Sequence, residues 1–450
     1  MKDGVVGAGA TGAGPERRRD HSWRLRWNFK VSTLDGMFAS VAMGMVNPFL
    51  AVFALSLGAT NGVVGMITAV PALVNTIMYL PAAGMVERRR SKLRTSVTGA
   101  LFTRVFYLLM AFVPFLPWAK YRATILVAAI GLQTIPAVVT AVAWTALMGE
   151  TFPAEERARV FSMRSMFCSL VALLSSLLAG ILLDRVPYPA NYAALFVVSF
   201  LTSMVSLHYL SLMKETPMSE AASVRLPLSA RLRRPFVDKE HGRKFSVFTA
   251  SALLLHLGIN IAVPVYTIYH VRVLHLSNSI IGTLSLAGGL TAVLAYPMWG
   301  VVARRAGDAA VYTLSILAYA LFPVMYGLSR SPGYLIALQA AVGFFNAGFA
   351  FTLFNLTLAY VNPTESANGI AVFNMLINAT GIIAPFIATS VVSRWGIMPS
   401  FILSTLVRIL GCVIFIKAVG VDETFGKLHR MVSPSALRRR RLNRKAKGVL

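Results

Sequence analysis

Two titratable side chains lie inside long apolar stretches of the sequence, Asp35 and His256. When the chain is divided into its long apolar stretches and the polar segments between them, Asp35 is the only one of the 17 acidic residues that lies within an apolar stretch. An ionisable group in an apolar segment is costly unless it has a partner or a function. Either side chain could take up and release a proton in a repeated cycle. A second interpretation of Asp35 stays open, because the preceding Arg24, Arg26 and Lys30 could pair with it.

Polar side chains also recur at helical spacing in five apolar stretches. Residues at i, i+4, i+7 and i+11 share one face of a helix. Aligned amide, hydroxyl and indole groups can hydrogen-bond a solute or a neighbouring helix, and the sequence leaves both possibilities open. The stripes are Gln133, Thr140 and Trp144; Gln339 and Asn346; His256, Asn260 and Thr267; Asn374 and Asn378; and Asn47 with Gly36, Ser40 and Gly44.

The elements that carry these residues are predicted to be membrane-spanning helices. The chain is 56% hydrophobic and only 13% charged, whereas about a quarter of the residues in a soluble domain are charged. A helix needs about 20 apolar residues to cross a bilayer, and twelve stretches meet this length. We therefore expect an all-α integral membrane protein with spans near 31–57, 62–86, 95–118, 122–148, 160–183, 191–213, 245–269, 279–302, 310–328, 333–360, 368–393 and 398–419.

The basic residues indicate how these spans are oriented. Of the 43 Lys and Arg residues, 33 fall in the two ends of the chain and in alternate loops, which predicts that both termini are cytoplasmic. The protein should thus be a multi-pass protein of the cell (plasma or inner) membrane. The net charge of +26 does not suggest nucleic acid, since few aromatic residues are interleaved for base stacking. Anionic lipid headgroups are the expected partners of the basic tails.

A motif appears twice, half a chain apart. Both copies read Pro-x-x-Gly-x-Val-x-Arg-Arg, and the copies begin at Pro81 and Pro297. The proline loosens a helix end, and the glycine permits close helix approach. The repeat predicts two six-helix halves, 31–213 and 245–420, joined by a cytoplasmic linker, 214–244, and flanked by basic tails at 1–30 and 421–450.

This organisation resembles the major facilitator superfamily, whose signature after the second span reads Gly-x-Leu-Ala-Asp-Arg-x-Gly-Arg-Arg. The resemblance covers residues 30–420 and implies two pseudo-twofold-related six-helix bundles. It also implies a cytoplasmic gate, in which Arg88 and Arg89 would pair with Glu155 or Glu156. Glu87 supplies the signature's acid one position early, and Arg304 stands where aspartate is usual. The gate residues implied by the resemblance are Gly84, Glu87, Arg88, Arg89, Gly300, Arg304, Arg305 and Gly307.

The resemblance further implies that the first, fourth, seventh and tenth spans line a substrate cavity at the bundle interface. The polar stripes would then contact a small-molecule substrate, with Asp35 or His256 as the proton-coupling group. The expected function is secondary transport by alternating access, with proton-coupled efflux of a neutral or amphipathic solute preferred. Uptake of a small metabolite and a non-transporting membrane sensor are the alternatives.

Catalytic chemistry is not expected. The chain contains neither an H-E-x-x-H nor a G-x-S-x-G motif, and its histidines are scattered singly. The GAGATG segment at residues 7–12 lacks the preceding strand that a dinucleotide site requires. We therefore expect no catalytic residues, no bound metal and no cofactor.

Overall fold

The computed structural model describes residues 15–152, 154–215, 228–237, 242–361 and 366–419, and every regular element in this part is a helix. The helices of the first half are α1 (Pro15–Val46), α2 (Leu50–Ser56), α3 (Asn61–Glu87), α4 (Lys92–Phe112), η1 (Val113–Phe115), η2 (Ala119–Tyr121), α5 (Arg122–Thr151), α6 (Ala154–Arg185) and α7 (Ala190–Ser211). The others are α8 (Leu228–Val237), α9 (Gly242–Ile268), η3 (Tyr269–Val273), α10 (Asn278–Ala306), α11 (Asp308–Gly327), α12 (Pro332–Tyr360), α13 (Ser366–Trp395) and α14 (Ile397–Val419).

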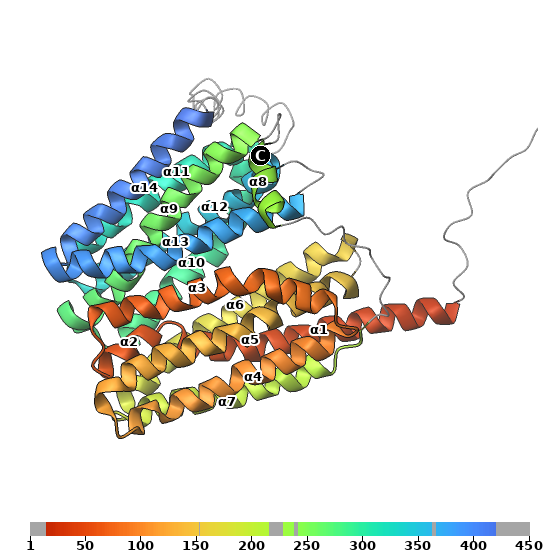
Figure 1. Cartoon of the computed structure of the whole chain (residues 1–450), viewed down its shortest axis with the longest axis horizontal. Coiled ribbons are helices and arrows are strands. Elements are labelled where there is room, and N and C mark those ends of the chain that lie inside the picture. Colours follow the sequence, from red (N-terminus) through yellow and green to blue (C-terminus); the bar gives the residue numbers. More distant parts are fainter. Residues whose placement is uncertain (1–14, 153, 216–227, 238–241, 362–365, 420–450) are drawn as a thin grey trace, which may run out of the picture.

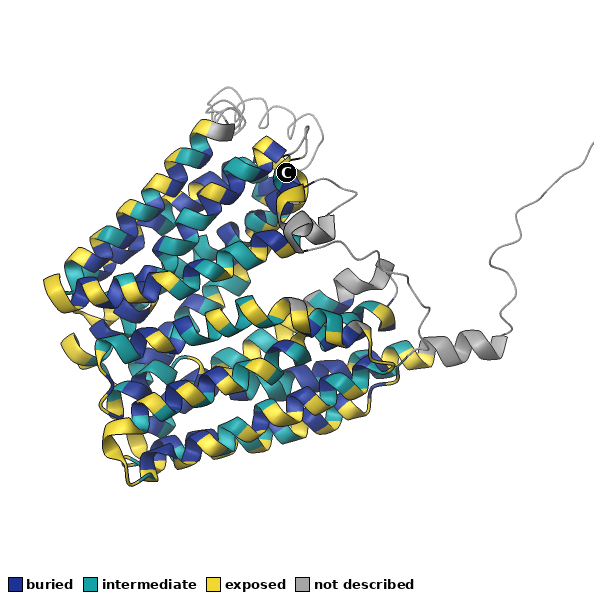
Figure 2. Cartoon of the chain, in the orientation of Figure 1, coloured by how far each residue is buried: buried dark blue, intermediate teal, exposed yellow. Residues whose placement is uncertain are grey.

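Twelve helical segments are long and apolar enough to cross a membrane. Figure 2 shows exposed residues along the outer faces of the helices, where many large apolar side chains lie. So large an exposed apolar surface is unfavourable in water but favourable in the hydrocarbon core of a bilayer. The predicted all-α membrane architecture is confirmed. Examples of these exposed side chains are Phe102, Leu178, Leu294, Leu321 and Phe354.

The packing of the two halves follows one pattern. In the first half, α1 packs on α6 and α7, α5 packs on α3 and α4, and α4 packs on α7. In the second half, α9 packs on α13 and α14, α12 packs on α10 and α11, and α11 packs on α14. Each membrane-spanning helix of the first half thus has an equivalent six spans later in the chain. The predicted duplication into two six-helix bundles is confirmed.

The bundles touch mainly through two equivalent pairs, α6 with α10 and α3 with α13. Figure 1 shows them side by side at one end and diverging toward the end that carries α8. We call the latter the linker end and the opposite end, with the α2–α3 and α9–α10 connections, the hairpin end. Glycines permit the close contact between bundles: a Cβ at Gly180 would lie 2.4 Å from the carbonyl oxygen of Asn278, and one at Gly282 would lie 2.7 Å from that of Ser176.

The first span differs from its sequence expectation at its start and by a break within it. Its helix starts at Pro15, inside the segment predicted as a tail, and part of that segment contacts the end of α7. The Trp27 indole donates to the Leu212 carbonyl, and Asn28 exchanges two hydrogen bonds with the Lys214 backbone. The helix ends at Val46 and resumes as α2 at Leu50, since Pro48 has no N–H to continue the ladder.

Candidate functional site

Asp35 lies at the centre of a buried charge network that joins four helices. Its side chain, on α1, accepts a 2.6 Å hydrogen bond from the Ser206 hydroxyl on α7. Two guanidinium groups flank it, Arg104 on α4 at 3.8 Å and Arg164 on α6 at 3.9 Å. Asp35 is only 5% exposed. Its partners are therefore residues of distant helices, and the preceding basic segment does not supply them.

Arg164 is a residue of this network that the sequence did not single out. It lies on α6, about one turn inside the span predicted at 160–183 and next to a loop that already contains basic residues, so the sequence made it look like a charge that only orients the span. Its Nε donates to the Ser32 carbonyl at 3.1 Å, and its guanidinium lies 4.5 Å from the centre of the Trp144 ring. A Cβ at Gly36 would lie 2.6 Å from the Arg164 Nη2 atom. The only sequence signal for this contact was the small-residue stripe of the first span.

The two mid-span arginines of the outer helices lie between helices. Arg104 donates from Nη2 to the Ser206 hydroxyl at 2.8 Å. Arg408 on α14 donates to the Tyr319 carbonyl at 2.8 Å, and its guanidinium stacks over that ring. Among the described residues, no carboxylate pairs with Arg408. The second bundle thus holds a buried cation that carbonyl oxygens and a ring face stabilise.

Four of the expected substrate residues contact neighbouring helices of their own bundle. The Gln133 amide donates to the Thr103 carbonyl on α4 at 3.1 Å. Thr140 also lies against α4, where a Cβ at Gly99 would meet its hydroxyl at 2.5 Å. Asn260 donates to the Thr380 hydroxyl on α13 at 2.9 Å. Gln339 lies against α10, where a Cβ at Gly288 would meet its amide nitrogen at 3.1 Å. These polar groups stabilise helix contacts.

Asn374 and Asn378 lie on the face of α13 that is directed toward the first bundle. With Gly381 and Pro385 they occupy positions i, i+4, i+7 and i+11 of one helical stripe. Gly381 contacts Ala72 on α3, and the Pro385 carbonyl lies close to Gly65 on the same helix. The two asparagines follow this contact surface toward the linker end and are both exposed. They therefore face the space between the diverging bundles.

Asn47, Asn346 and His256 complete the expected set. Asn47 is exposed in the break between α1 and α2, next to the stripe of Gly36 and Gly44 that packs on α6. Asn346 is half-buried on α12, and its amide has no hydrogen-bond partner within the described chain. His256 has Nδ1 2.9 Å from the carbonyl oxygen of Ala252, one turn earlier in α9. His256 is thus already engaged by its own helix.

The hairpin end is closed by polar contacts between the bundles. Arg272 on η3 donates to the Asn61 side chain and to the Ala59 carbonyl, both at 2.6 Å. Asp184, in the last turn of α6, accepts from the backbone N–H groups of Asn278 and Ser279 at 2.9 and 2.8 Å. A carboxylate at a helix start satisfies unpaired N–H groups and complements the helix dipole. Asp184 therefore fixes the start of α10 to the first bundle.

Removing this carboxylate should loosen the hairpin end. We expect Asp184→Ala to cost about 1 kcal/mol, which is about a fivefold shift in an open–closed equilibrium. The measurement is the thiol-labelling rate of Ser176→Cys, a buried position at the α6–α10 contact, in a background with Cys168 and Cys412 replaced by alanine. Ser277→Ala is the matched control, because Ser277 caps α10 from within its own chain segment. Equal labelling in both variants would contradict this assignment.

The repeated motif lies at the linker end. Arg88, Arg89, Arg304 and Arg305 are exposed there. Gly307 ends α10 with φ of 92°, a left-handed conformation that favours glycine. The side chains of Glu87, Glu155 and Glu156 lie outside the described residues, so the gate pairing stays a prediction.

The motif glycines have no close neighbours in this structure. A Cβ at Gly84 would meet nothing within 4 Å, and one at Gly300 would meet only Arg304 at 3.8 Å. The expected close helix approach at these positions is not observed, because the bundles diverge at the linker end.

Comparisons with known proteins agree with this architecture. The family profile described as Major Facilitator Superfamily matches residues 36–251 and again 248–442. No curated protein sequence matches the chain significantly. Within the described residues, no group of three or more His, Cys, Asp or Glu side chains could hold a metal ion.

Three solved structures share the fold at low sequence identity. The nucleoside transporter NupG has a TM-score of 0.67 at 11% identity, covering 87% of this chain and 98% of that one. A bacterial homologue of the human lysosomal transporter Spinster, in an inward-facing and unoccupied conformation, has a TM-score of 0.64 at 13% identity, covering 92% of this chain and 99% of that one. The human organic anion transporter MFSD10 has a TM-score of 0.60 at 16% identity, covering 87% of this chain and 99% of that one.

Proposed function

The chain belongs to the major facilitator superfamily, and from this premise we propose that it moves a small solute across the cell membrane by alternating access. The observation that carries the proposal is the arrangement of the two bundles. They are bonded to each other at the hairpin end and diverge at the linker end, where Asn374 and Asn378 face the opposite bundle. Rocking of two repeats about an interface site is how such folds expose a site to each side in turn.

A neutral or amphipathic solute fits the uncharged polar groups of these helices. The exposed asparagines of α13 and the amide of Asn346 on α12 offer uncharged donors and acceptors. Trp144 adds an aromatic surface whose ring already binds the Arg164 guanidinium. We propose efflux as the direction. The basic loops of the linker end support its assignment to the cytoplasm, with both termini on that side.

Asp35 is the better of the two proton-coupling candidates. His256 is engaged by the Ala252 carbonyl of its own helix. Asp35 instead connects groups on α4, α6 and α7, so a change in its charge alters contacts among several helices. Protonation of Asp35 would remove the negative charge between Arg104 and Arg164. Arg164 would then be free to leave Asp35 while it keeps its contacts with Ser32 and Trp144.

The experiment that tests this function is a ligand screen followed by transport. Thermal stability of the purified full chain in detergent is measured against neutral, anionic and amphipathic compounds, since a ligand at a hundred times its dissociation constant adds about 2.7 kcal/mol. A stabilising compound is then assayed for accumulation in sealed proteoliposomes with an imposed proton gradient. Saturable transport of a highly charged metabolite alone would contradict the proposed substrate class.

Two variants distinguish a substrate contact from a helix contact. We expect Asn346→Ala to remove most of the ligand-induced stabilisation while the unliganded melting temperature stays unchanged, because its amide has no partner within the described chain. Gln133→Ala should instead lower the unliganded melting temperature and keep the ligand-induced stabilisation. It loses the hydrogen bond to the Thr103 carbonyl, which is worth about 0.6 kcal/mol in a membrane helix pair. Loss of ligand stabilisation in Gln133→Ala alone would place the site on α5.

A further inference from the structure

A groove on the outer face of the first bundle is not used by the proposed transport path. It encloses about 440 Å³ at the linker end, and its lining residues come from α3, α4, α5 and the α3–α4 loop. α3 and α4 each pack on α5, so α5 forms the floor of the groove. Figure 1 shows α4 on the side of the first bundle that faces away from α9–α14. The groove thus opens toward the surrounding membrane.

The lining residues are arranged by polarity along α4. Ser91, Arg94, Thr95, Thr98, Gly99 and Phe102 follow one another from the loop into the span. They occupy one stripe of the helix over roughly 16 Å, at 1.5 Å per residue. The stripe is polar at the linker end and becomes apolar at Phe102, which is 58% exposed. Met85, Pro136 and Val139 extend the apolar part from α3 and α5.

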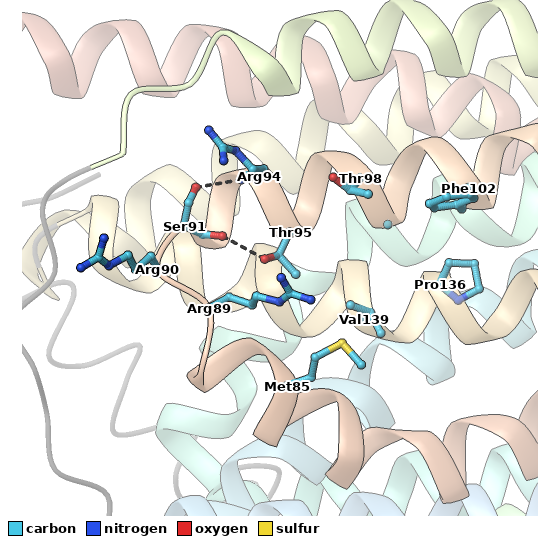
Figure 3. Close-up of a pocket in the computed structure, with 11 residues that line it drawn as sticks. Met85, Arg89, Arg90, Ser91, Arg94, Thr95, Thr98, Phe102, Pro136 and Val139 are labelled. Carbon is cyan, nitrogen blue, oxygen red and sulfur yellow. Dashed lines mark hydrogen bonds between the residues drawn. The ribbon is translucent and has the colours of Figure 1, made fainter.

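Arg89 is the cation that reaches into the groove. Figure 3 shows its guanidinium extended between Thr95 and Val139, whereas the guanidinium groups of Arg90 and Arg94 point away at the rim. Within the described residues, no carboxylate lies within ion-pair distance of these three arginines. The neighbouring Lys92, in contrast, pairs with Glu150.

One carboxylate borders the polar end of the groove. Glu215 accepts from the Ser91 hydroxyl and from the Lys92 backbone N–H, both at 2.6 Å, and so occupies the start of α4. Its single negative charge is outnumbered by the three arginines. Among the described residues, the polar end therefore carries an excess of positive charge.

We propose that this groove binds one anionic phospholipid from the leaflet at the linker end. The phosphate contacts the Arg89 guanidinium, and an acyl chain lies along Met85, Phe102 and Val139. A guanidinium recognises a phosphate through charge-assisted hydrogen bonds. A free anion would use only the polar end and would leave the apolar part exposed. Along α4 the polar groups precede the apolar ones, in the same order in which the polar headgroup of a lipid precedes its acyl chain.

The test is lipid binding to the purified full chain, followed by native mass spectrometry and by thermal stability in detergent. The probes are phosphatidylglycerol, phosphatidylcholine of the same chains, and inorganic phosphate. We expect phosphatidylglycerol to bind and stabilise the protein. Arg89→Gln should weaken this binding about tenfold, the effect of losing one charge-assisted contact. Val139→Trp should weaken it by filling the apolar part.

Arg243→Gln is the matched control, because Arg243 is an exposed arginine at the same end but on the second bundle. It should bind phosphatidylglycerol as the original chain does. If Arg89→Gln and Arg243→Gln lose the same affinity for phosphatidylglycerol, the lipid is attracted by diffuse charge, and the proposed site is wrong. Equal stabilisation by inorganic phosphate would identify a free-anion site instead of a lipid site. Arg89 is exposed, so Arg89→Gln remains informative even where Val139→Trp fails to fold.

Discussion

Asp35→Asn is expected to lower the free energy of unfolding by about 3 kcal/mol, the cost of leaving a buried charge without its partner. The substitution keeps the shape of the side chain and an oxygen that can accept from Ser206. It removes the only carboxylate within ion-pair distance of Arg104 and Arg164 in the described structure. Two guanidinium groups then stay close together in a largely dry site. The repulsion between the two guanidinium groups and the loss of their pairing with Asp35 both lower the free energy of unfolding.

The effect is measured by unfolding in increasing SDS and by the apparent melting temperature in detergent. Ser206→Ala is the matched control, since it removes the hydrogen bonds to Asp35 and from Arg104 but no charge. It should cost about 1 to 2 kcal/mol. Removing one guanidinium with Arg104→Met in the Asp35→Asn background should restore part of the lost stability. If Asp35→Asn is as stable as Ser206→Ala, the two arginines do not depend on this carboxylate.

Transport provides an independent readout of the same residue. If Asp35 couples protons, Asp35→Asn should abolish accumulation driven by a proton gradient but retain downhill exchange of the solute. A purely structural role predicts that both activities fall together with stability.

Gly343→Ala should be the most damaging alanine substitution of a glycine within the spans. A Cβ at this position would lie 1.9 Å from the carbonyl oxygen of Gly288 and 2.5 Å from the Thr291 hydroxyl. Neither backbone can move without separating α10 from α12. Overpacking of this kind costs about 3 kcal/mol, which exceeds the roughly 1 kcal/mol that alanine gains over glycine in a helix.

Gly84→Ala is the control for the intrinsic helix effect, because a Cβ there would meet nothing within 4 Å. It should leave the melting temperature unchanged or raise it slightly. The fraction of monodisperse protein after heating distinguishes the two variants. A Gly343→Ala protein as stable as Gly84→Ala would mean that α10 and α12 are not in close contact.

The spans and the duplication could be predicted from the sequence because both follow from local physics. A bilayer requires about 20 consecutive apolar residues in each helix, and the repeated motif at Pro81 and Pro297 marks equivalent loops in the two halves. The extension of α1 into the segment predicted as a basic tail was missed because its contact partner, the end of α7 at Leu212, is distant in the chain from Trp27.

The candidate site was only partly predictable. Asp35 was recognised because an acid inside an apolar segment is costly, and the stripes were recognised from their helical spacing. Arg164 was not singled out, since one more arginine near a basic loop carries no periodic signal. Its importance comes from contacts with Ser32 and Trp144, which are distant in the chain.

The sequence by itself determined how many helices cross the membrane, where they begin within a few turns, and that they form two equivalent sets. Only the tertiary structure decided that Gln133 turns toward α4 and that Asn374 turns toward the opposite bundle. Helical spacing places residues on a common face but does not fix the rotation of that face about the helix axis. Packing against neighbouring helices sets this rotation, and glycines such as Gly343 set how closely those neighbours approach.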